Sequence, residues 1–298
     1  MTEPQSTPEP TVHQRNVMLR IAYRGTNYCG WQIQPNGPSI QQHLEAAIEK
    51  LTRSQTRILC AGRTDSGVHA VGQVASFRTE SQIPCPQMMR GLQAFLPDDI
   101  IILHAQDVAS QFHATFSAER KRYRYVMQIG AHRSPFLNEL VHRLRYRPDV
   151  AAMQQACSHL LGTHDFRCFE SHFPNKATSV RTIQEAGFSF CGSWNPWDPL
   201  DVPTHQLVNH ASAETGGRTA HAEFLVFDIM ADGFLYNMVR AIVGTLLDVG
   251  TRKQNPQWMQ QVIESRDRSR AGMTAPACGL YLVHVEYPQS LLQPELSR

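Results

Sequence analysis

The sequence predicts an α+β fold in which two similar units of strands and packed helices join in one extended antiparallel sheet. Two observations predict it. Strand-like and helix-like segments alternate in a similar order in both halves of the chain, although no sequence identity between the halves is visible. The 298 residues, 42% of them apolar, are also enough for one large or two ordinary domains with a substantial core.

The first unit opens with a strand and a capped helix. Residues 17–23 are predicted to form a strand with Val17, Leu19, Ile21 and Tyr23 on one face and Arg20 on the other. Ser39 begins a capping box, and apolar residues follow it at helical spacing as far as Leu51. The remaining predicted elements are strands near 56–62 and 71–78, a helix near 86–96 and a strand near 99–108.

The second unit begins with a strand from Ala118. It continues with a helix near 150–161, strands near 178–190 and 221–231, helices at 234–249 and near 256–265, and a strand near 279–287. Residues 162–166 are interpreted as a helix end and turn without chemistry. The Trp- and Pro-rich stretch at 191–220 lacks periodicity and is predicted to be a long excursion between two strands.

These patterns predict four parts of the chain. A polar, Pro-rich tail at 1–15 is expected to be disordered, the two α+β units occupy 16–115 and 116–288, and 289–298 form a second tail. No apolar run approaches a signal core or a membrane span, so no membrane association is expected. Seven cysteines without a Cys-x-x-Cys pair indicate reduced thiols and a cytoplasmic location. Because the net charge is only +2, an acidic partner must be bound by a local cluster of basic side chains.

The segment from Cys60 to Ala70 combines a carboxylate, a guanidinium, hydroxyls and an imidazole between two glycines. Gly62 and Gly67 allow sharp turns on both sides of Asp65, which predicts an outward-facing carboxylate. Asp, Ser and Gly are also ordinary turn residues, so a turn without chemistry is the alternative.

Aromatic and basic side chains alternate along the strand that begins at Ala118. Tyr123 lies on one face, and Arg122 and Arg124 lie on the other. A phenol can stack on a nucleobase while guanidiniums meet phosphates, as in the recognition of unpaired RNA. The alternative is a half-buried strand with a solvated basic edge.

The helix predicted at 234–249 places an arginine beside its buried stripe. Tyr236, Val239, Val243 and Leu247 define that stripe, and Arg240 lies next to it. A cation directed toward the protein needs a carboxylate, because an unpaired buried charge is very costly. Asp65 is one candidate partner; pairing with the nearby Asp232 or Asp248, or exposure to solvent, are the alternatives.

Two leucines at the start of the last predicted strand, Leu280 and Leu282, are able to line an apolar pocket, although core packing is the ordinary role of such residues. Metal spacings, the phosphate-binding loop, the dinucleotide fingerprint and the serine-hydrolase elbow are all absent from the sequence. We therefore expect neither a metal nor a nucleotide cofactor.

Several motifs together resemble the tRNA pseudouridine synthase A (TruA) family. They are Gly62-Arg-Thr-Asp-Ser-Gly-Val-His69, Lys121-Arg-Tyr-Arg-Tyr125, Phe234-Leu-Tyr-Asn-Met-Val-Arg240 with Gly244-Thr-Leu246, and Ala277-Cys-Gly-Leu-Tyr-Leu282, supported by Tyr28-Cys-Gly-Trp-Gln32, Phe112-His-Ala-Thr-Phe-Ser117 and Ser179-Val-Arg-Thr-Ile183. The resemblance runs from about Val17 to Tyr287. The stretch at 191–220 is longer than the family usually carries, and Cys168 stands where a serine is common.

The resemblance implies a function and a set of roles. Family members isomerise uridine to pseudouridine at positions 38, 39 and 40 of the tRNA anticodon stem-loop, without a cofactor or a required metal. By resemblance Asp65 is the nucleophile, Arg240 its ion-pair partner and Tyr123 the residue that stacks on the base and serves as a candidate general base. Leu280 packs against the base, and Arg63 contacts the RNA as the target nucleotide flips out.

The resemblance also implies the pseudouridine synthase fold: helices on one side of the sheet, a central RNA-binding cleft and a homodimer that binds tRNA. Two other functions are the alternatives. A catalytically inert RNA-binding relative would have no need of Asp65, Tyr123 and Arg240 together. An Asp-nucleophile hydrolase or phosphotransferase would require a second carboxylate for magnesium near Asp65, and that loop has none.

Overall fold

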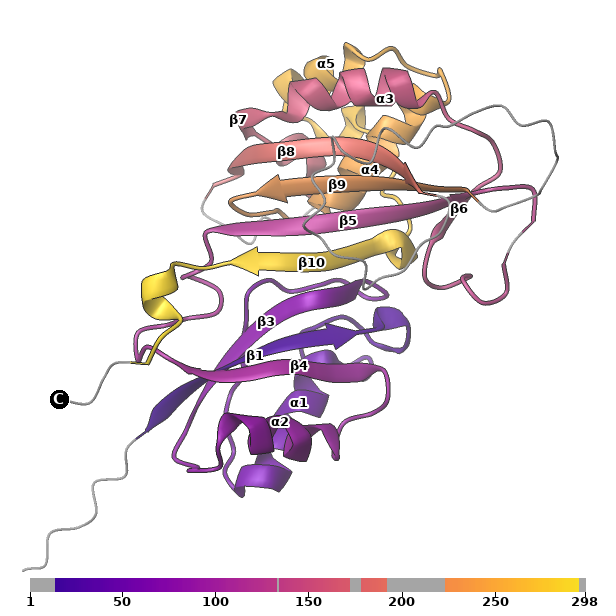
Figure 1. The fold of residues 1–298 in the computed structure, drawn as a ribbon. Helices are drawn as coiled ribbons and strands as arrows, with labels where there is room; N and C mark the ends of the chain where they lie inside the picture. Colours follow the sequence, from indigo (N-terminus) through magenta and orange to yellow (C-terminus); the bar gives the residue numbers. More distant parts are fainter. Residues whose placement is uncertain (1–13, 133, 172–177, 192–222, 295–298) are drawn as a thin grey trace, which may run out of the picture.

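The computed structural model describes residues 14–132, 134–171, 178–191 and 223–294. Ten strands form one sheet, whose main path runs β4-β1-β3-β10-β5-β9-β8-β7, while β2 pairs with β3 and β6 with β5 (Figure 1). The strands are β1 Arg15–Tyr23, β2 Leu59–Cys60, β3 His69–Thr79, β4 Ile100–Val108, β5 Arg120–Ile129, β6 His142–Leu144, β7 Gly162–Asp165, β8 Val180–Cys191, β9 Glu223–Ala231 and β10 Leu280–Glu286. The helices are α1 Ile40–Thr52, α2 Cys85–Gln93, α3 Val150–Cys157, α4 Met238–Gly250 and α5 Trp258–Ser265.

The α+β class predicted from the sequence fits this arrangement, but the sheet is mixed rather than purely antiparallel. The last strand, β10, enters the middle of the sheet, where it pairs parallel with β3 and antiparallel with β5. β6 also runs parallel to β5. The antiparallel prediction was wrong here because strands far apart in sequence are free to pair in either direction, whereas a short hairpin must be antiparallel.

One face of the sheet carries the helices. A single buried cluster contains side chains from all five of the helices named above, together with strand residues such as Tyr123, Phe227 and Leu282. A smaller cluster, which includes Val71, Val126 and Tyr281, lies on the opposite face. Because successive strand residues point to opposite faces, Tyr123 and Val126 belong to different layers.

Most predicted elements are present with shifted ends, and two local predictions were wrong. Residues Gly162–Asp165, expected to be a helix end and turn, form strand β7 against β8. Helix α4 begins at Met238 rather than near 234, because Asn237 has a φ of 60° and so cannot continue a right-handed helix. Tyr236 therefore lies before the helix and is 49% exposed, although it was predicted to belong to the packed stripe.

Ser39 caps the start of α1 as expected, since its hydroxyl accepts a hydrogen bond from the Gln42 amide at 3.2 Å. The excursion predicted at 191–220 lies outside the described residues except for Cys191, which ends β8. None of the described helices is both long and apolar enough to cross a membrane.

Candidate active site

The loop between β2 and β3 carries Asp65, and a neighbouring segment fixes its shape. The Trp31 amide donates to the Thr64 carbonyl at 3.0 Å, and the Ser66 hydroxyl donates to the Tyr28 carbonyl at 3.2 Å. Gly30 permits this approach, because it has a φ of 92° and a side chain there would lie 2.5 Å from the Thr64 oxygen. The loop is therefore held in one conformation from the β1–α1 connection.

Inside the loop, the Val68 amide donates to the Asp65 carbonyl at 3.1 Å, and Gly67 has a φ of 76°. These features close a tight turn immediately after Asp65. Behind the loop, Gln73 donates to the Gly62 carbonyl at 2.7 Å, and the hydroxyls of Tyr23 and Thr64 are 2.7 Å apart. Buried polar contacts of this kind restrict the positions that the Asp65 carboxylate can reach.

The Asp65 carboxylate forms an ion pair with Arg240 of α4, 175 residues away in sequence. The Arg240 Nη1 to Asp65 Oδ2 distance is 3.2 Å, and both side chains are 18% exposed. The same guanidinium donates from Nε to the Ala275 carbonyl and from Nη1 to the Asn237 Oδ1, each at 2.8 Å. The carboxylate that pairs with Arg240 in the structure is therefore that of Asp65, rather than that of Asp232 or Asp248.

Burial and the ion pair act on Asp65 in opposite directions. Burial raises the pKa of the carboxyl group and is the larger effect, while the charge and hydrogen bond of Arg240 lower it. The net result is a pKa above the ordinary value for aspartate. Arg240 thus limits the effect of desolvation on the carboxylate without cancelling it.

Tyr123 of β5 lies beside the same loop. Its hydroxyl is 3.7 Å from the position that a side chain on Gly62 would occupy, and its ring meets Phe234 edge to face with centroids 5.0 Å apart. Burial raises the pKa of Tyr123 far above the usual value, and the nearby Tyr23 and Asp65 raise it further. The side chain is therefore a neutral phenol at physiological pH.

Leu280 lies at the start of β10 and is 5% exposed. It pairs with Tyr125, whereas Leu282 is the residue directly opposite Tyr123. Both leucines belong to the buried cluster on the helix-bearing face. The structure thus places an apolar wall of two leucines on the same face as Tyr123.

The three arginines predicted to contact substrate occupy different surroundings. Arg63 is exposed two residues before Asp65. Arg122 pairs with Glu185 at 2.7 Å, and Arg124 pairs with Asp228 through two hydrogen bonds of 2.9 and 3.1 Å. By strand alternation Arg122 and Arg124 lie on the face opposite Tyr123, so the structure does not bring them to the Asp65 loop.

Two side chains of the site were not identified from the sequence, Asn237 and Phe234. Asn237 accepts the hydrogen bond from Arg240 described above and also donates to the Ser171 hydroxyl at 2.9 Å. Phe234 packs against Tyr123. Both residues lie in the motif Phe234-Leu-Tyr-Asn-Met-Val-Arg240. Their position in that motif was the sequence feature that could have identified them as site residues.

The part of the chain described here contains no group of three or more His, Cys, Asp or Glu side chains that could hold a metal ion. The groups that meet at Asp65 are its carboxylate, the Arg240 guanidinium and the neutral phenol of Tyr123.

The chain is similar to known proteins of one family. The family model described as tRNA pseudouridine synthase matches residues 20–117 and 156–288, which is more than half of the chain. The tRNA pseudouridine synthase A of Acetivibrio thermocellus is 42% identical over 273 residues, covering 92% of this chain and 100% of that protein. The protein of the same name from Francisella tularensis subsp. novicida is 38% identical over 275 residues, covering 92% of this chain and 95% of that protein.

A third relative, the tRNA pseudouridine synthase A of Pseudoalteromonas translucida, is 37% identical over 279 residues, covering 94% of each chain. The protein has helices on one face of a mixed sheet and a paired carboxylate beside a buried tyrosine. With these matches it is an isomerase, since pseudouridine synthases are isomerases. The chain belongs to the tRNA pseudouridine synthase family.

Proposed function

We propose that this protein isomerises uridine to pseudouridine in the anticodon stem-loop of tRNA, at positions 38, 39 and 40, with Asp65 as the nucleophile. The observation that carries the proposal is the Asp65 carboxylate held by Arg240 at 3.2 Å, on a rigid loop beside Tyr123. The names of the relatives support tRNA as the substrate.

The reaction breaks the bond from N1 of uracil to C1′ of ribose and forms a bond from C5 to C1′. The Asp65 carboxylate adds covalently either to the uracil ring or to C1′, the base detaches and rotates, and the carboxylate leaves when the new bond has formed. The proton on C5 is lost and N1 gains one, so the product is an isomer of the substrate. Only the ionised form of Asp65 can attack, which gives Arg240 its role.

The neighbouring side chains suit a flipped uracil. Tyr123 and Leu280, 7% and 5% exposed, are the aromatic and apolar side chains to which the resemblance assigns stacking on the base and packing against it. Arg63 is exposed beside the loop, where its guanidinium is free to contact RNA while the nucleotide leaves its stack, a step that costs a few kcal/mol.

As the family resemblance implies, we also propose a cytoplasmic homodimer; light scattering of the purified protein tests the dimer.

The direct test is incubation of the purified protein with unmodified tRNA, without added metal or nucleotide, followed by carbodiimide labelling and primer extension. New stops at positions 38 to 40 support the proposal. Absence of stops together with tight, salt-sensitive tRNA binding would instead identify an inert RNA-binding relative.

The raised pKa of Asp65 predicts an unusual acid limb in the pH profile. Activity requires the carboxylate, so kcat/KM should be constant above the pKa of Asp65 and fall as pH decreases through it. Because burial raises this pKa, the midpoint should lie above the value of about 3.9 for free aspartate. Measuring kcat/KM from neutral pH downward checks this, and a midpoint at or below that value contradicts it.

The fold must be monitored in the same pH series, because His69 titrates there. Burial lowers the pKa of His69 to about 4, and its Nδ1 accepts a hydrogen bond from the Gly25 amide at 3.0 Å. In the unfolded chain the imidazole of His69 takes up a proton at about pH 6.5, whereas in the folded protein it does so only at about pH 4. Neutral His69 therefore contributes stability that is lost as pH falls from about 6.5 to about 4. Far-UV circular dichroism at each pH separates loss of activity from loss of structure.

Tyr123→Phe distinguishes stacking from proton transfer. The phenylalanine keeps the aromatic face, and the raised pKa of Tyr123 disfavours transfer through its phenolate. We expect an activity loss well below the roughly 10²–10⁴-fold that a general base supplies, measured as single-turnover rate. A loss within that range would assign the proton transfer to Tyr123.

A further inference from the structure

Two cations on the Tyr123 face of the sheet have no assigned role in the isomerisation, Lys121 and Arg181. Both belong to motifs noted in the sequence, at the start of β5 and of β8. Lys121 and Ile183 each pair with Ala231 of β9, so the three residues form one row across the sheet. Ala231 and Ile183 belong to the helix-side cluster, and Lys121 and Arg181 therefore face the same side as Tyr123.

Lys121 lies against the Asp65 loop. Its Cδ and Cε atoms are each 3.9 Å from the position that a side chain on Gly62 would occupy, next to the Tyr123 hydroxyl at 3.7 Å from the same point. The side chain is half-buried, and within the described parts of the chain no carboxylate comes within ion-pair distance of it. Burial lowers the pKa of Lys121, and the positive charge of Arg181 lowers it further, whereas Cys60 and the Asp232 carboxylate raise it.

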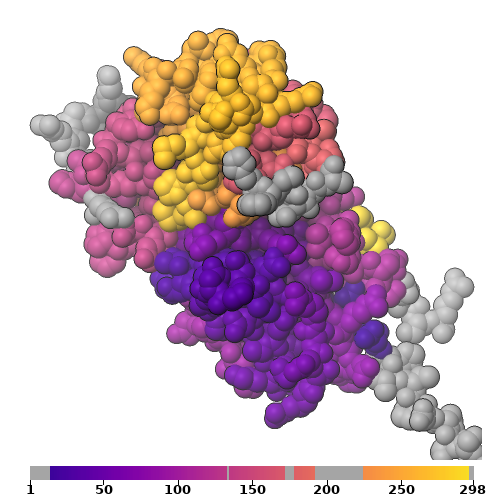
Figure 2. All heavy atoms as spheres, turned by 180° about the vertical axis from the view of Figure 1, so that it is seen from behind, coloured from indigo at the N-terminus to yellow at the C-terminus, as the bar shows by residue number. Residues whose placement is uncertain are grey.

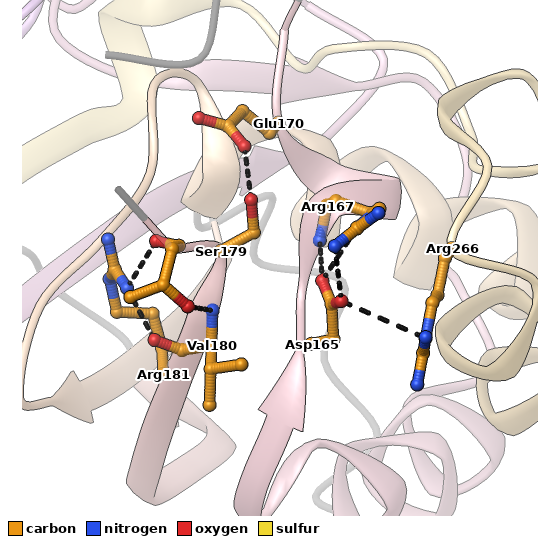
Figure 3. A network of polar contacts seen from close by, with 8 residues as sticks. Asp165, Arg167, Glu170, Ser179, Val180, Arg181 and Arg266 are labelled. Atoms are coloured by element: carbon orange, nitrogen blue, oxygen red, sulfur yellow. Dashed lines mark hydrogen bonds and ion pairs between the residues drawn. The ribbon is translucent and has the colours of Figure 1, made fainter. Parts of the chain in front are cut away.

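Arg181 is 7% exposed and also lacks a carboxylate partner among the described residues. Its guanidinium donates to the carbonyl of Thr178 at 2.9 Å and to that of Val180. Figure 3 shows two nearby acidic groups that are directed elsewhere: Asp165 binds Arg167 and Arg266, and Glu170 accepts from the Ser179 hydroxyl at 2.7 Å. A third, Asp232, accepts through Oδ1 from the Thr182 amide at 3.0 Å.

Among the described residues, neither of these two partly or wholly buried cations has a carboxylate at ion-pair distance, and their charges repel one another. The Asp232 carboxylate acts on Lys121 only from beyond that distance. Such an arrangement is costly unless an anion completes it, because desolvated charges need a counter-charge. Arg63, exposed on the same loop as Asp65, extends the positive charge toward solvent. An RNA strand whose uridine reaches Asp65 necessarily brings its own phosphodiesters close to that loop.

We propose that Lys121 and Arg181 form a binding subsite for a phosphodiester group of the RNA backbone next to the flipped uridine. The inference rests on the proposed function, since it takes RNA as the substrate. In the bound state Lys121 donates to a phosphate oxygen as a point charge, and Arg181 supplies a second cation from β8. The subsite fixes the backbone on one side of the target nucleotide while the base enters between Tyr123 and the leucine wall.

The test measures binding of an unmodified tRNA transcript to the full chain as a function of salt. Lys121→Met keeps the length of the side chain and removes its charge. Each lost phosphate contact reduces the slope of log K against log salt by about 0.7–0.9. The ratio of wild-type to variant affinity should therefore shrink by about threefold between about 50 and about 200 mM salt.

Four further variants separate the effect of charge from that of structure. Lys121→Arg should restore the salt slope, and Lys253→Met, which removes a lysine paired with Asp248 at 3.0 Å outside the site, should leave it unchanged. Arg181→Met should reproduce the reduced slope while Arg181→Lys keeps it, which tests the subsite independently if Lys121→Met folds poorly. In turnover, KM should rise with little change in kcat.

An unchanged salt slope in both Lys121→Met and Arg181→Met overturns the proposal, as does an equal effect of Lys253→Met. These binding outcomes do not depend on turnover. Wild-type protein that forms no pseudouridine would instead overturn the proposed function.

Discussion

Asp65→Asn should abolish pseudouridine formation and leave tRNA binding nearly intact. The amide has the shape of the carboxylate and can still accept from Arg240, but it cannot act as the nucleophile. Removing the nucleophile of a covalent mechanism lowers kcat on the order of 10⁴-fold or more. Affinity should change little, because phosphate contacts dominate binding to nucleic acid.

The assay compares single-turnover pseudouridine formation and filter binding of the same tRNA for wild type and variant. Asp248→Asn is the matched control, since this carboxylate is also paired, with Lys253 at 3.0 Å, but lies outside the Asp65 site. Its rate should equal that of the wild type. Turnover by Asp65→Asn within tenfold of the wild-type rate would remove Asp65 from the role of nucleophile.

Individual strands and helices of this fold can be predicted from sequence patterns, whereas the pairing of strands that are distant in sequence cannot. The existence of strand β1 and the capped start of α1 are set by neighbouring residues and were predicted, although β1 is buried on both faces from Asn16 to Tyr23 except at Arg20. The insertion of β10 between β3 and β5 joins segments far apart in sequence, and no local pattern encodes its direction. Figure 2 shows the consequence, with the early, indigo part of the chain meeting the late, yellow part in the middle of the molecule.

The site shows the same division. An arginine beside a buried stripe demands a carboxylate, so the partnership of Arg240 with Asp65 was among the sequence-based hypotheses. The partners of Arg122 and Arg124 come from the register of β8 and β9, which the sequence does not reveal, and so both arginines were expected to face RNA. The start of α4 was misplaced because the apolar residues before Asn237 continue the helical pattern although its backbone does not.

Arg240→Ala should lower both activity and stability. The variant leaves the Asp65 carboxylate partly buried without its cation and leaves the Ala275 carbonyl without its donor. Removing one member of a fully buried pair costs about 3–5 kcal/mol, and with 18% of each side chain exposed we expect about 2 kcal/mol, measured by urea unfolding. The pKa of Asp65 should rise further, because the opposing effect of Arg240 is lost.

Activity should fall about 10²-fold at neutral pH through misplacement of the carboxylate, and the acid limb of kcat/KM should move to higher pH. The control is Arg252→Ala, which removes an arginine 82% exposed and paired with Asp149 at 3.1 Å; exposed pairs contribute about 0–1 kcal/mol. If the acid limb shifts in Arg240→Ala but not in Arg252→Ala, the Arg240 guanidinium controls the ionisation of Asp65. Full activity with an unshifted limb would show that the pair observed at 3.2 Å is structural only, so that burial alone sets the reactivity of Asp65.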